Sequence, residues 1–206
     1  CQVAALRNFS SNQENLYTVD LICHGSPSPE LLKMYLKEKS VDIEELEELN
    51  FREKTSFGLR STEKDIGFSR IVDMYTYAFL KSLDYTENCY SCQYATIERV
   101  ADVTIGDSWG SDLSDDEKRN GISLLLCQTQ KGLDIVENSG MQLKEVDLTK
   151  AVEANHQLRH PSIAPETRKI FFANLDKGFY KAISKCSPKA YYKLKLKEIL
   201  IKLKVI

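Results

Sequence analysis

Four cysteines, Cys1, Cys23, Cys89 and Cys92, have the type and spacing to hold a metal centre. Cys89 and Cys92 lie in the stretch ENCYSCQY, so one tight loop can supply two thiols. Such a pair can form a disulfide, bind zinc, bind an iron–sulfur cluster, or serve only as small buried side chains. Structural zinc and a 4Fe-4S cluster each take four protein ligands, and Cys1 and Cys23 are the leading candidates for the other two. The residues alone leave both a metal centre and a purely structural role open.

The remaining cysteines and the histidines do not extend this set. Cys127 lies within the apolar run GISLLLCQT and is expected in the core, and Cys186 is expected to be a bystander. His24 directly follows a candidate ligand, but neighbouring residues of a strand point to opposite faces. His156 and His160 are four residues apart and could share a helix face, although two solvent-facing histidines are the favoured interpretation.

A second group of residues lies in the stretch TIGDSWG. Gly106 and Gly110 bracket Asp107 and Trp109, and glycines let backbone amides approach a ligand closely. The loop could cradle a phosphate or pack on an aromatic ring, or it could be an ordinary tight turn capped by Asp107. Lys54 lies near a glycine and could hold an anionic group or face the solvent.

These residues are expected where strands end and helices begin. The run LYTVDLIC, residues 16–23, is read as a buried strand that ends just before a turn. Ser28 is a predicted N-cap with Pro29 at the first helical position. The helix that follows shows an apolar stripe of Leu31, Leu32, Tyr35 and Leu36. Cys23 and His24 should therefore lie at the carboxyl end of a strand, where open α/β sheets place ligands.

The rest of the chain predicts a mixed fold. The expected class is α/β (α+β mixed), with a mixed β-sheet flanked by helices and a helical C-terminal tail. Further strands are expected at residues 49–52, 68–72, 100–105, 121–129 and 141–146. Further helices are expected at residues 74–83, 133–138, 149–158 and 167–177.

Length and composition indicate a soluble globular protein. The chain has 206 residues, 42% hydrophobic and 28% charged, and its net charge of −2 argues against a general nucleic-acid binder. No signal peptide and no membrane-spanning run is visible, and the sparse cysteines favour a reducing compartment, so a cytoplasmic protein is expected. The chain begins at Cys1 without an initiator methionine, so we expect a piece of a longer protein.

The Lys-rich C-terminal tail supports two interpretations. Its apolar residues fit a helical stripe with lysines opposite, which could contact an anionic membrane surface. The favoured interpretation is a helix that covers the core or docks a missing domain. The stripe consists of Tyr192, Leu196, Ile199, Leu200 and Leu203.

Taken together, the motifs resemble a known family. The stretches CQVAALRNF, VDLICHGSPSP, NFREK, CYSCQYATIERVADVTIGDSWG and GISLLL occur in this order. The set is similar to the C-terminal domain of the coenzyme F420 (deazaflavin) hydrogenase/dehydrogenase beta subunit family. The resemblance covers residues 1–168, and residues 169–206 form a helical, Lys-rich extension. It implies an oxidoreductase, or a subunit of one, that carries electrons with FAD and a 4Fe-4S cluster.

The resemblance also implies roles for particular residues. Cys1, Cys23, Cys89 and Cys92 match the cysteines shared within the family and become the expected cluster ligands. The flavin pocket is expected to involve Ser26, Lys54, Thr104, Gly106, Asp107, Trp109 and Gly110. The expected partners are a redox protein or ferredoxin-type domain, and a deazaflavin or other small-molecule acceptor.

One departure and one alternative accompany this resemblance. The family usually has Gly-Trp in the loop after FREK, whereas this chain reads FGLR, so ring stacking there is not expected. The alternative function is a zinc- or cysteine-stabilised module without a catalytic role, acting in a polysaccharide-synthesis pathway.

Overall fold

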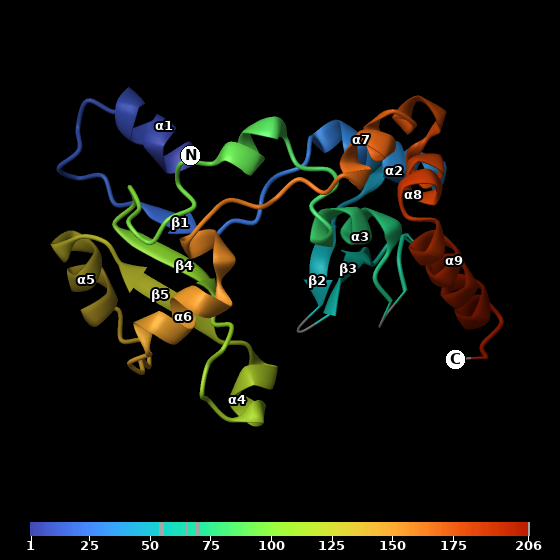
Figure 1. Ribbon diagram of the computed structural model, residues 1–206. Coiled ribbons are helices and arrows are strands. Elements are labelled where there is room, and N and C mark those ends of the chain that lie inside the picture. Colours follow the sequence, from blue (N-terminus) through green and yellow to red (C-terminus); the bar gives the residue numbers. More distant parts are fainter. Residues whose placement is uncertain (54–55, 65, 69–70, 206) are drawn as a thin grey trace. The chain divides into compact units, whose positions relative to one another are not determined.

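The structure is a computed structural model that describes residues 1–53, 56–64, 66–68 and 71–205. The chain forms two compact units, and each is built from two separate segments (Figure 1). Unit 1 comprises Cys1–His24 and Asn88–Ser162, and unit 2 comprises Gly25–Glu87 and Ile163–Ile206. The expected boundary at residue 168 is not tested by this division and stays a prediction.

Unit 1 is built on a mixed three-stranded sheet in the order β1-β4-β5. β1 (Val19–Leu21) runs parallel to β4 (Val103–Asp107), which runs antiparallel to β5 (Ser123–Cys127). The expected mixed sheet is therefore confirmed. β1 is not the buried strand that its apolar residues suggested, because it lies at the sheet edge with Val19 59% and Leu21 65% exposed.

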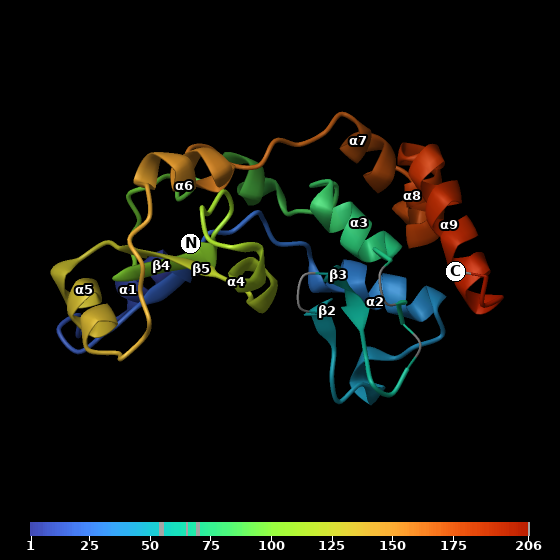
Figure 2. The ribbon, with the colours of Figure 1, turned by 90° about the horizontal axis from the view of Figure 1, so that it is seen from below.

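Helices surround this sheet in Figures 1 and 2. They are α1 (Gln2–Phe9), α4 (Asp115–Asn120), α5 (Gln130–Glu137) and α6 (Leu148–Ala154), followed by the 3-10 turn η3 (His156–Leu158). Residues of α6, η3 and the sheet form an apolar cluster around Leu124. The strand expected at residues 141–146 is absent, because this segment pairs with no strand among the described residues.

Asp102, just before β4, ties the parts of unit 1 together. Its buried carboxylate accepts hydrogen bonds from the Thr18 amide at 2.8 Å and the Thr18 hydroxyl at 2.7 Å. The Thr129 hydroxyl donates to the other carboxylate oxygen at 2.9 Å, and Arg7 of α1 forms an ion pair at 3.0 Å. One side chain thus joins α1, the start of β1 and the N-cap of α5.

Unit 2 is mainly helical, with one small antiparallel sheet. Its helices are α2 (Pro29–Glu38), α3 (Met74–Leu80), α7 (Thr167–Phe172), α8 (Phe179–Cys186) and α9 (Pro188–Lys202), and its 3-10 turns include η1 (Ile43–Glu45) and η4 (Leu175–Lys177). The sheet pairs β2 (Asn50–Glu53) with β3 (Ser56–Arg60). The second strand was expected at residues 68–72; the described residues of that stretch are not in a strand, and β3 lies earlier in the chain.

The core of unit 2 follows from the stripes of α2 and α8. The predicted cap is confirmed, because the Ser28 hydroxyl accepts the Glu30 amide at 3.3 Å, and all four residues of the predicted α2 stripe are buried. They pack in one cluster with the buried face of α8, which includes Phe179 and Ile183. Glu38 at the end of α2 accepts the Phe179 and Tyr180 amides and so caps α8, where a carboxylate complements the helix dipole.

Helix α9 packs on the rest of unit 2 with a different face from the one expected. Tyr191 and Leu194 pack against the core cluster, whereas Tyr192, Leu196, Ile199 and Leu203 of the predicted stripe are exposed. The helix therefore covers part of the core, as expected, but it does so with Tyr191 and Leu194 instead of the predicted stripe. In the part of the chain that the structure describes, we find no helix with the length and apolar character needed to cross a membrane.

Candidate functional site

The parallel pair β1 and β4 places two predicted groups of residues at one edge of the sheet. Leu21 of β1 lies opposite Ile105 of β4, and the Ile22 amide donates to the Ile105 carbonyl at 2.8 Å. Parallel strands end at the same edge, so Cys23 and the loop from Gly106 onward leave the sheet side by side. The predicted placement of Cys23 at the carboxyl end of a strand is confirmed.

The histidines form a row at this edge. The His24 and His156 rings meet edge to face with centroids 5.5 Å apart, and the His156 and His160 rings stack at 5.3 Å. Gln157 lies 2.6 Å from His24 Nδ1, and an amide nitrogen can only donate, so Nδ1 accepts and neutral His24 carries its proton on Nε2. His160 is exposed, as the favoured interpretation expects, whereas His156 is half-buried and contacts both other rings.

The surroundings of the histidine row favour its neutral form. Loss of water around its ring and the nearby His156 lower the pKa of His24, against an opposing effect of Asp107. Burial and the neighbouring His160 and Arg159 lower the pKa of His156. The helical spacing of His156 and His160 was a usable signal in the sequence. No signal in the sequence indicated that His24 approaches these two residues, because more than a hundred residues separate His24 from them.

The four predicted cysteine ligands all belong to unit 1. Cys89 and Cys92 lie in and just after the 3-10 turn η2 (Glu87–Ser91) and are half-buried, whereas Cys1 and Cys23 are exposed. In the view of Figure 1 the amino terminus, which is Cys1, and η2 both lie above the sheet. Among the described residues, however, no three His, Cys, Asp or Glu side chains converge closely enough to hold a metal ion.

The segment after Cys92 is fixed to the sheet beside Cys23. Arg99 forms an ion pair with Asp20 of β1 at 2.9 Å, and both side chains are nearly buried. The Arg99 guanidinium also donates to the Leu21 carbonyl at 2.8 Å, and the Gln128 amide donates to the Ile97 carbonyl at 3.0 Å. Arg99 therefore holds the segment that follows Cys92 against the strand that leads into Cys23.

The predicted flavin-pocket residues are distributed over both units. Ser26 belongs to unit 2, and Lys54 lies outside the described residues. Thr104 is fully buried within β4, where its hydroxyl accepts a hydrogen bond from Gln128 at 3.3 Å. The others lie at the sheet edge of unit 1, where Asp107 ends β4 and the Trp109 side chain is 45% exposed.

The two glycines of the TIGDSWG loop each have a packing partner within unit 1. A Cβ at Gly106 would lie 2.6 Å from Ile22 Cδ1, and one at Gly110 would lie 2.9 Å from Ala154 Cβ. Gly110 also has a φ of +72°, which few other residues adopt. Close packing of the chain on itself is therefore sufficient to require glycine at both positions.

Replacing Gly106 with alanine should destabilise unit 1 by about 1–3 kcal/mol, because the methyl group would overlap Ile22. Ile22→Ala in the same chain removes the overlapping Cδ1 and Cγ1 atoms but keeps Cβ at 2.8 Å, so the double variant should recover part of the loss. Urea unfolding followed by the fluorescence of Trp109, the single tryptophan, measures both effects. If the stability losses of the two single variants simply add up in the double variant, the packing explanation is contradicted.

Unit 1 combines a mixed sheet with flanking helices, an α/β arrangement in which ligands commonly bind where the parallel strands end. Residues 1–152 match the family model that describes the C terminus of the coenzyme F420 hydrogenase/dehydrogenase beta subunit. The chain belongs to this family, as the sequence resemblance predicted. A comparison with curated proteins gives no match. The matched residues include the four cysteines and the TIGDSWG loop, and they end within α6.

Proposed function

We propose that this chain is the C-terminal module of an iron–sulfur flavoprotein subunit that passes electrons between a 4Fe-4S cluster, FAD and an acceptor. The observation that carries the proposal is that the family match includes four cysteines, all of them in one unit. Family membership supports an oxidoreductase subunit with a redox partner. The cofactors and the acceptor are the proposed part.

Cys1, Cys23, Cys89 and Cys92 would be the cluster ligands. Four thiolates match the donor number and softness that a 4Fe-4S cluster requires. The thiols do not converge in this structure, so the fit is one of donor type, number and shared unit, and the proposal includes no step through the cluster. Arg99 supports the assignment because it ties the segment that follows Cys92 to the strand before Cys23.

FAD would be bound at the sheet edge where β1 and β4 end. When bound, a flavin supplies both one-electron transfer and two-electron hydride transfer. Trp109 offers an exposed aromatic ring there, and Asp107 offers a carboxylate for a hydroxyl group. His24 is exposed at the same edge and, with its Nδ1 accepting from Gln157, offers its Nε2–H as a hydrogen-bond donor.

The partners follow from the same chemistry. The electrons would come from or go to a redox protein or ferredoxin-type domain, and the hydride acceptor would be a deazaflavin or another small molecule. Thiolates that bind a cluster must be kept from oxidation to disulfides, which a reducing compartment ensures, so we place the protein in the cytoplasm.

Anaerobic purification of the full-length gene product, with iron, sulfide, zinc and flavin measured per chain, tests the proposal. We expect bound flavin and a visible iron–sulfur absorbance, and Cys89→Ser should abolish the share of iron and absorbance that this cluster supplies. Cys127→Ser is the matched control, because Cys127 is exposed on β5 and outside the proposed set.

Each alternative has its own result in this experiment. Zinc with no flavin would replace the redox proposal with a zinc-stabilised module that lacks a redox role. An equal loss of iron in Cys89→Ser and Cys127→Ser would reject the assigned ligands. Unchanged iron in every variant of the four cysteines would place the cluster elsewhere in the full-length protein and would also reject them.

A further inference from the structure

Helix α9 has two apolar faces instead of one. The inner face includes Tyr191 and Leu194, which pack against the core cluster of unit 2. The outer face has residues spaced by four, three and four positions, which places them on one side of a helix. They are Tyr192, Leu196, Ile199 and Leu203, with 69%, 56%, 51% and 67% of their surfaces exposed. Packing on the rest of unit 2 therefore leaves these four apolar side chains exposed.

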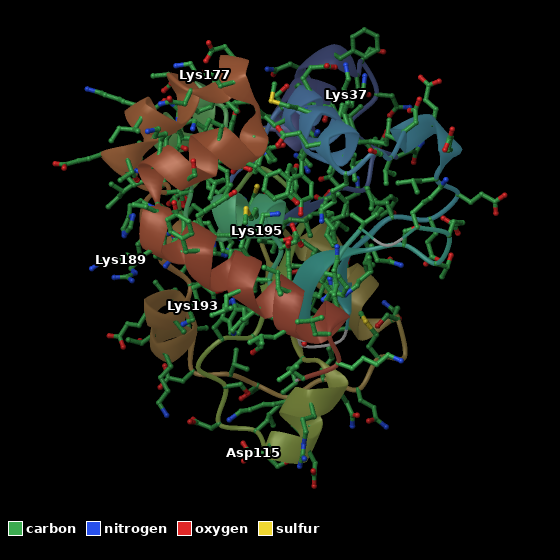
Figure 3. The ribbon with its side chains drawn as sticks, turned by 90° about the vertical axis from the view of Figure 1, so that its right-hand side faces the viewer. Lys37, Asp115, Lys177, Lys189, Lys193 and Lys195 are labelled. Carbon is green, nitrogen blue, oxygen red and sulfur yellow. The ribbon has the colours of Figure 1, made fainter. Side chains whose placement is uncertain are left out.

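Lysines flank the outer face on both sides. Figure 3 looks onto α9, and Lys193 and Lys195 lie on opposite sides of the helix in that view. At 100° per residue, Lys189 and Lys197 fall on the same side as Lys193, and Lys202 falls on the side of Lys195. The Lys195 ammonium lies over the Tyr180 ring and pairs with Glu198. The outer face is therefore a narrow apolar stripe with a row of three lysines on one side and Lys202 on the other.

The charge of this segment differs from that of the rest of the chain. Residues 188–206 contain six lysines and one glutamate, a net charge of +5, whereas the whole chain carries −2. The single acidic residue, Glu198, is turned away from solvent, with its side chain 14% exposed and paired to Lys195 at 3.4 Å. The exposed surface of α9 thus has no carboxylate to repel an anionic ligand.

The end of α9 is well defined, so the stripe belongs to a formed helix. The Val205 amide donates to the Leu200 carbonyl at 2.9 Å and the Lys204 amide donates to the Ile201 carbonyl at 2.8 Å. This pair of bonds is the Schellman motif, with Lys204 in the left-handed region at a φ of 56°. Leu203 and the lysines of the last turn are therefore held in register with Tyr192 at the other end.

We propose that the outer face of α9 binds the surface of a membrane that contains anionic lipids, with the helix lying in the interface. The apolar stripe would enter the boundary between headgroups and acyl chains, and the flanking lysines would reach lipid phosphates with their ammonium groups. Charge complementarity and the width of the stripe favour this occupant. A protein partner of ordinary size would need a broader apolar patch than one row of side chains. The proposal is independent of the cofactors.

Co-sedimentation of the full-length gene product with lipid vesicles tests this proposal. We expect binding to phosphatidylcholine vesicles that contain about one-third phosphatidylglycerol, weaker binding to phosphatidylcholine alone, and loss of binding at high salt. Leu196→Gln with Ile199→Gln should weaken binding to the anionic vesicles at least tenfold. The matched control is Met141→Gln with Leu143→Gln, since these residues are each 51% exposed in unit 1.

A second pair of variants tests the charges without touching the apolar stripe. Lys193→Gln with Lys197→Gln should weaken binding by roughly fivefold for each lysine removed. Lys81→Gln with Lys118→Gln removes the same charge from α3 and α4 termini and should change binding little. Circular dichroism checks that each variant keeps its helix content.

Three outcomes would overturn the proposal. The first is an absence of binding to anionic vesicles by the unmodified protein, and the second is equal loss in the α9 variants and their controls. The third is a difference in molecular mass, measured by light scattering, between the unmodified protein and the variant with Leu196 and Ile199 replaced, when neither protein binds vesicles. That result would make the outer face an interface between copies of this chain.

Discussion

Asp102→Ala is expected to lower the free energy of unfolding of unit 1 by about 1–3 kcal/mol. The substitution leaves the Arg7 guanidinium without its carboxylate and leaves the Thr18 amide and the Thr129 hydroxyl without their acceptor. Thr18 is buried, so its amide carries the full cost of lost hydration once its acceptor is removed, whereas water can reach Arg7 and Thr129. Burial alone would raise the pKa of Asp102, but the hydrogen bonds from Thr18, Thr129 and Arg7 outweigh it and lower the pKa.

The lowered pKa also predicts the pH at which this contribution disappears. The folded state binds the Asp102 proton more weakly than the unfolded chain, so the stabilisation is present above the usual aspartate pKa of about 4 and is lost as the pH falls below it. Urea unfolding followed by Trp109 fluorescence at neutral and acidic pH measures both effects in unit 1. The difference between wild type and variant should shrink in acid.

A surface ion pair provides the control for Asp102. Asp116 pairs with Arg119 on α4, but its side chain is 86% exposed, so Asp116→Ala should change the stability by less than about 1 kcal/mol. Similar losses for the two variants would mean that the network around Asp102 adds nothing beyond an exposed pair, and the role assigned to this residue would fail.

Local signals in the sequence predicted α2 and α3 of unit 2 well. The cap at Ser28, the proline at the first helical position and the stripe of α2 each act within a few residues, and the structure bears them out. The same holds for β4 and β5, whose apolar runs are bounded by glycines. In these segments the local preference and the packed fold agree.

The errors arise where the outcome depends on a distant partner. Residues 141–146 alternate like a strand, but no neighbouring strand pairs with them, and Met141 and Leu143 are exposed. Cys127 was expected in the core, yet it is exposed because β5 lies at an edge of the sheet. An apolar run indicates that a strand can form, but it does not give the strand's position in the sheet.

The candidate site likewise contains residues that the sequence identified and contacts that it did not reveal. The four cysteines and the TIGDSWG loop were identified from their residue types and from the family resemblance, and the family is confirmed. The Arg99–Asp20 pair and the approach of His24 to His156 were missed, because both contacts join segments far apart in the chain. Such contacts become visible only after the sheet has brought those segments together.

Asp84 should make the stability of unit 2 fall as the pH rises from 5 to 8, by about 2–3 kcal/mol. This carboxyl lies just after α3, is 1% exposed, and has no hydrogen-bond partner for either oxygen among the described residues. Burial raises the pKa of Asp84 to about 7, although Arg168 opposes the shift. The folded state therefore holds the proton more tightly than the unfolded chain, so the stabilisation is complete in acid and is lost as the pH rises through 7.

Asp84→Asn removes the charge while nearly preserving the volume, so the variant should lose most of this pH dependence. At pH 8 it should be more stable than the wild type, because no charge has to be buried on folding. Urea unfolding followed by circular dichroism suits unit 2, which is mainly helical, and the difference between the slopes of the two proteins isolates Asp84. Asp176→Asn is the control, since Asp176 is exposed in η4 and its replacement should leave the slope unchanged. An identical pH dependence in Asp84→Asn and wild type would show that Asp84 is ionised in the fold at ordinary cost, with Arg168 compensating for its burial.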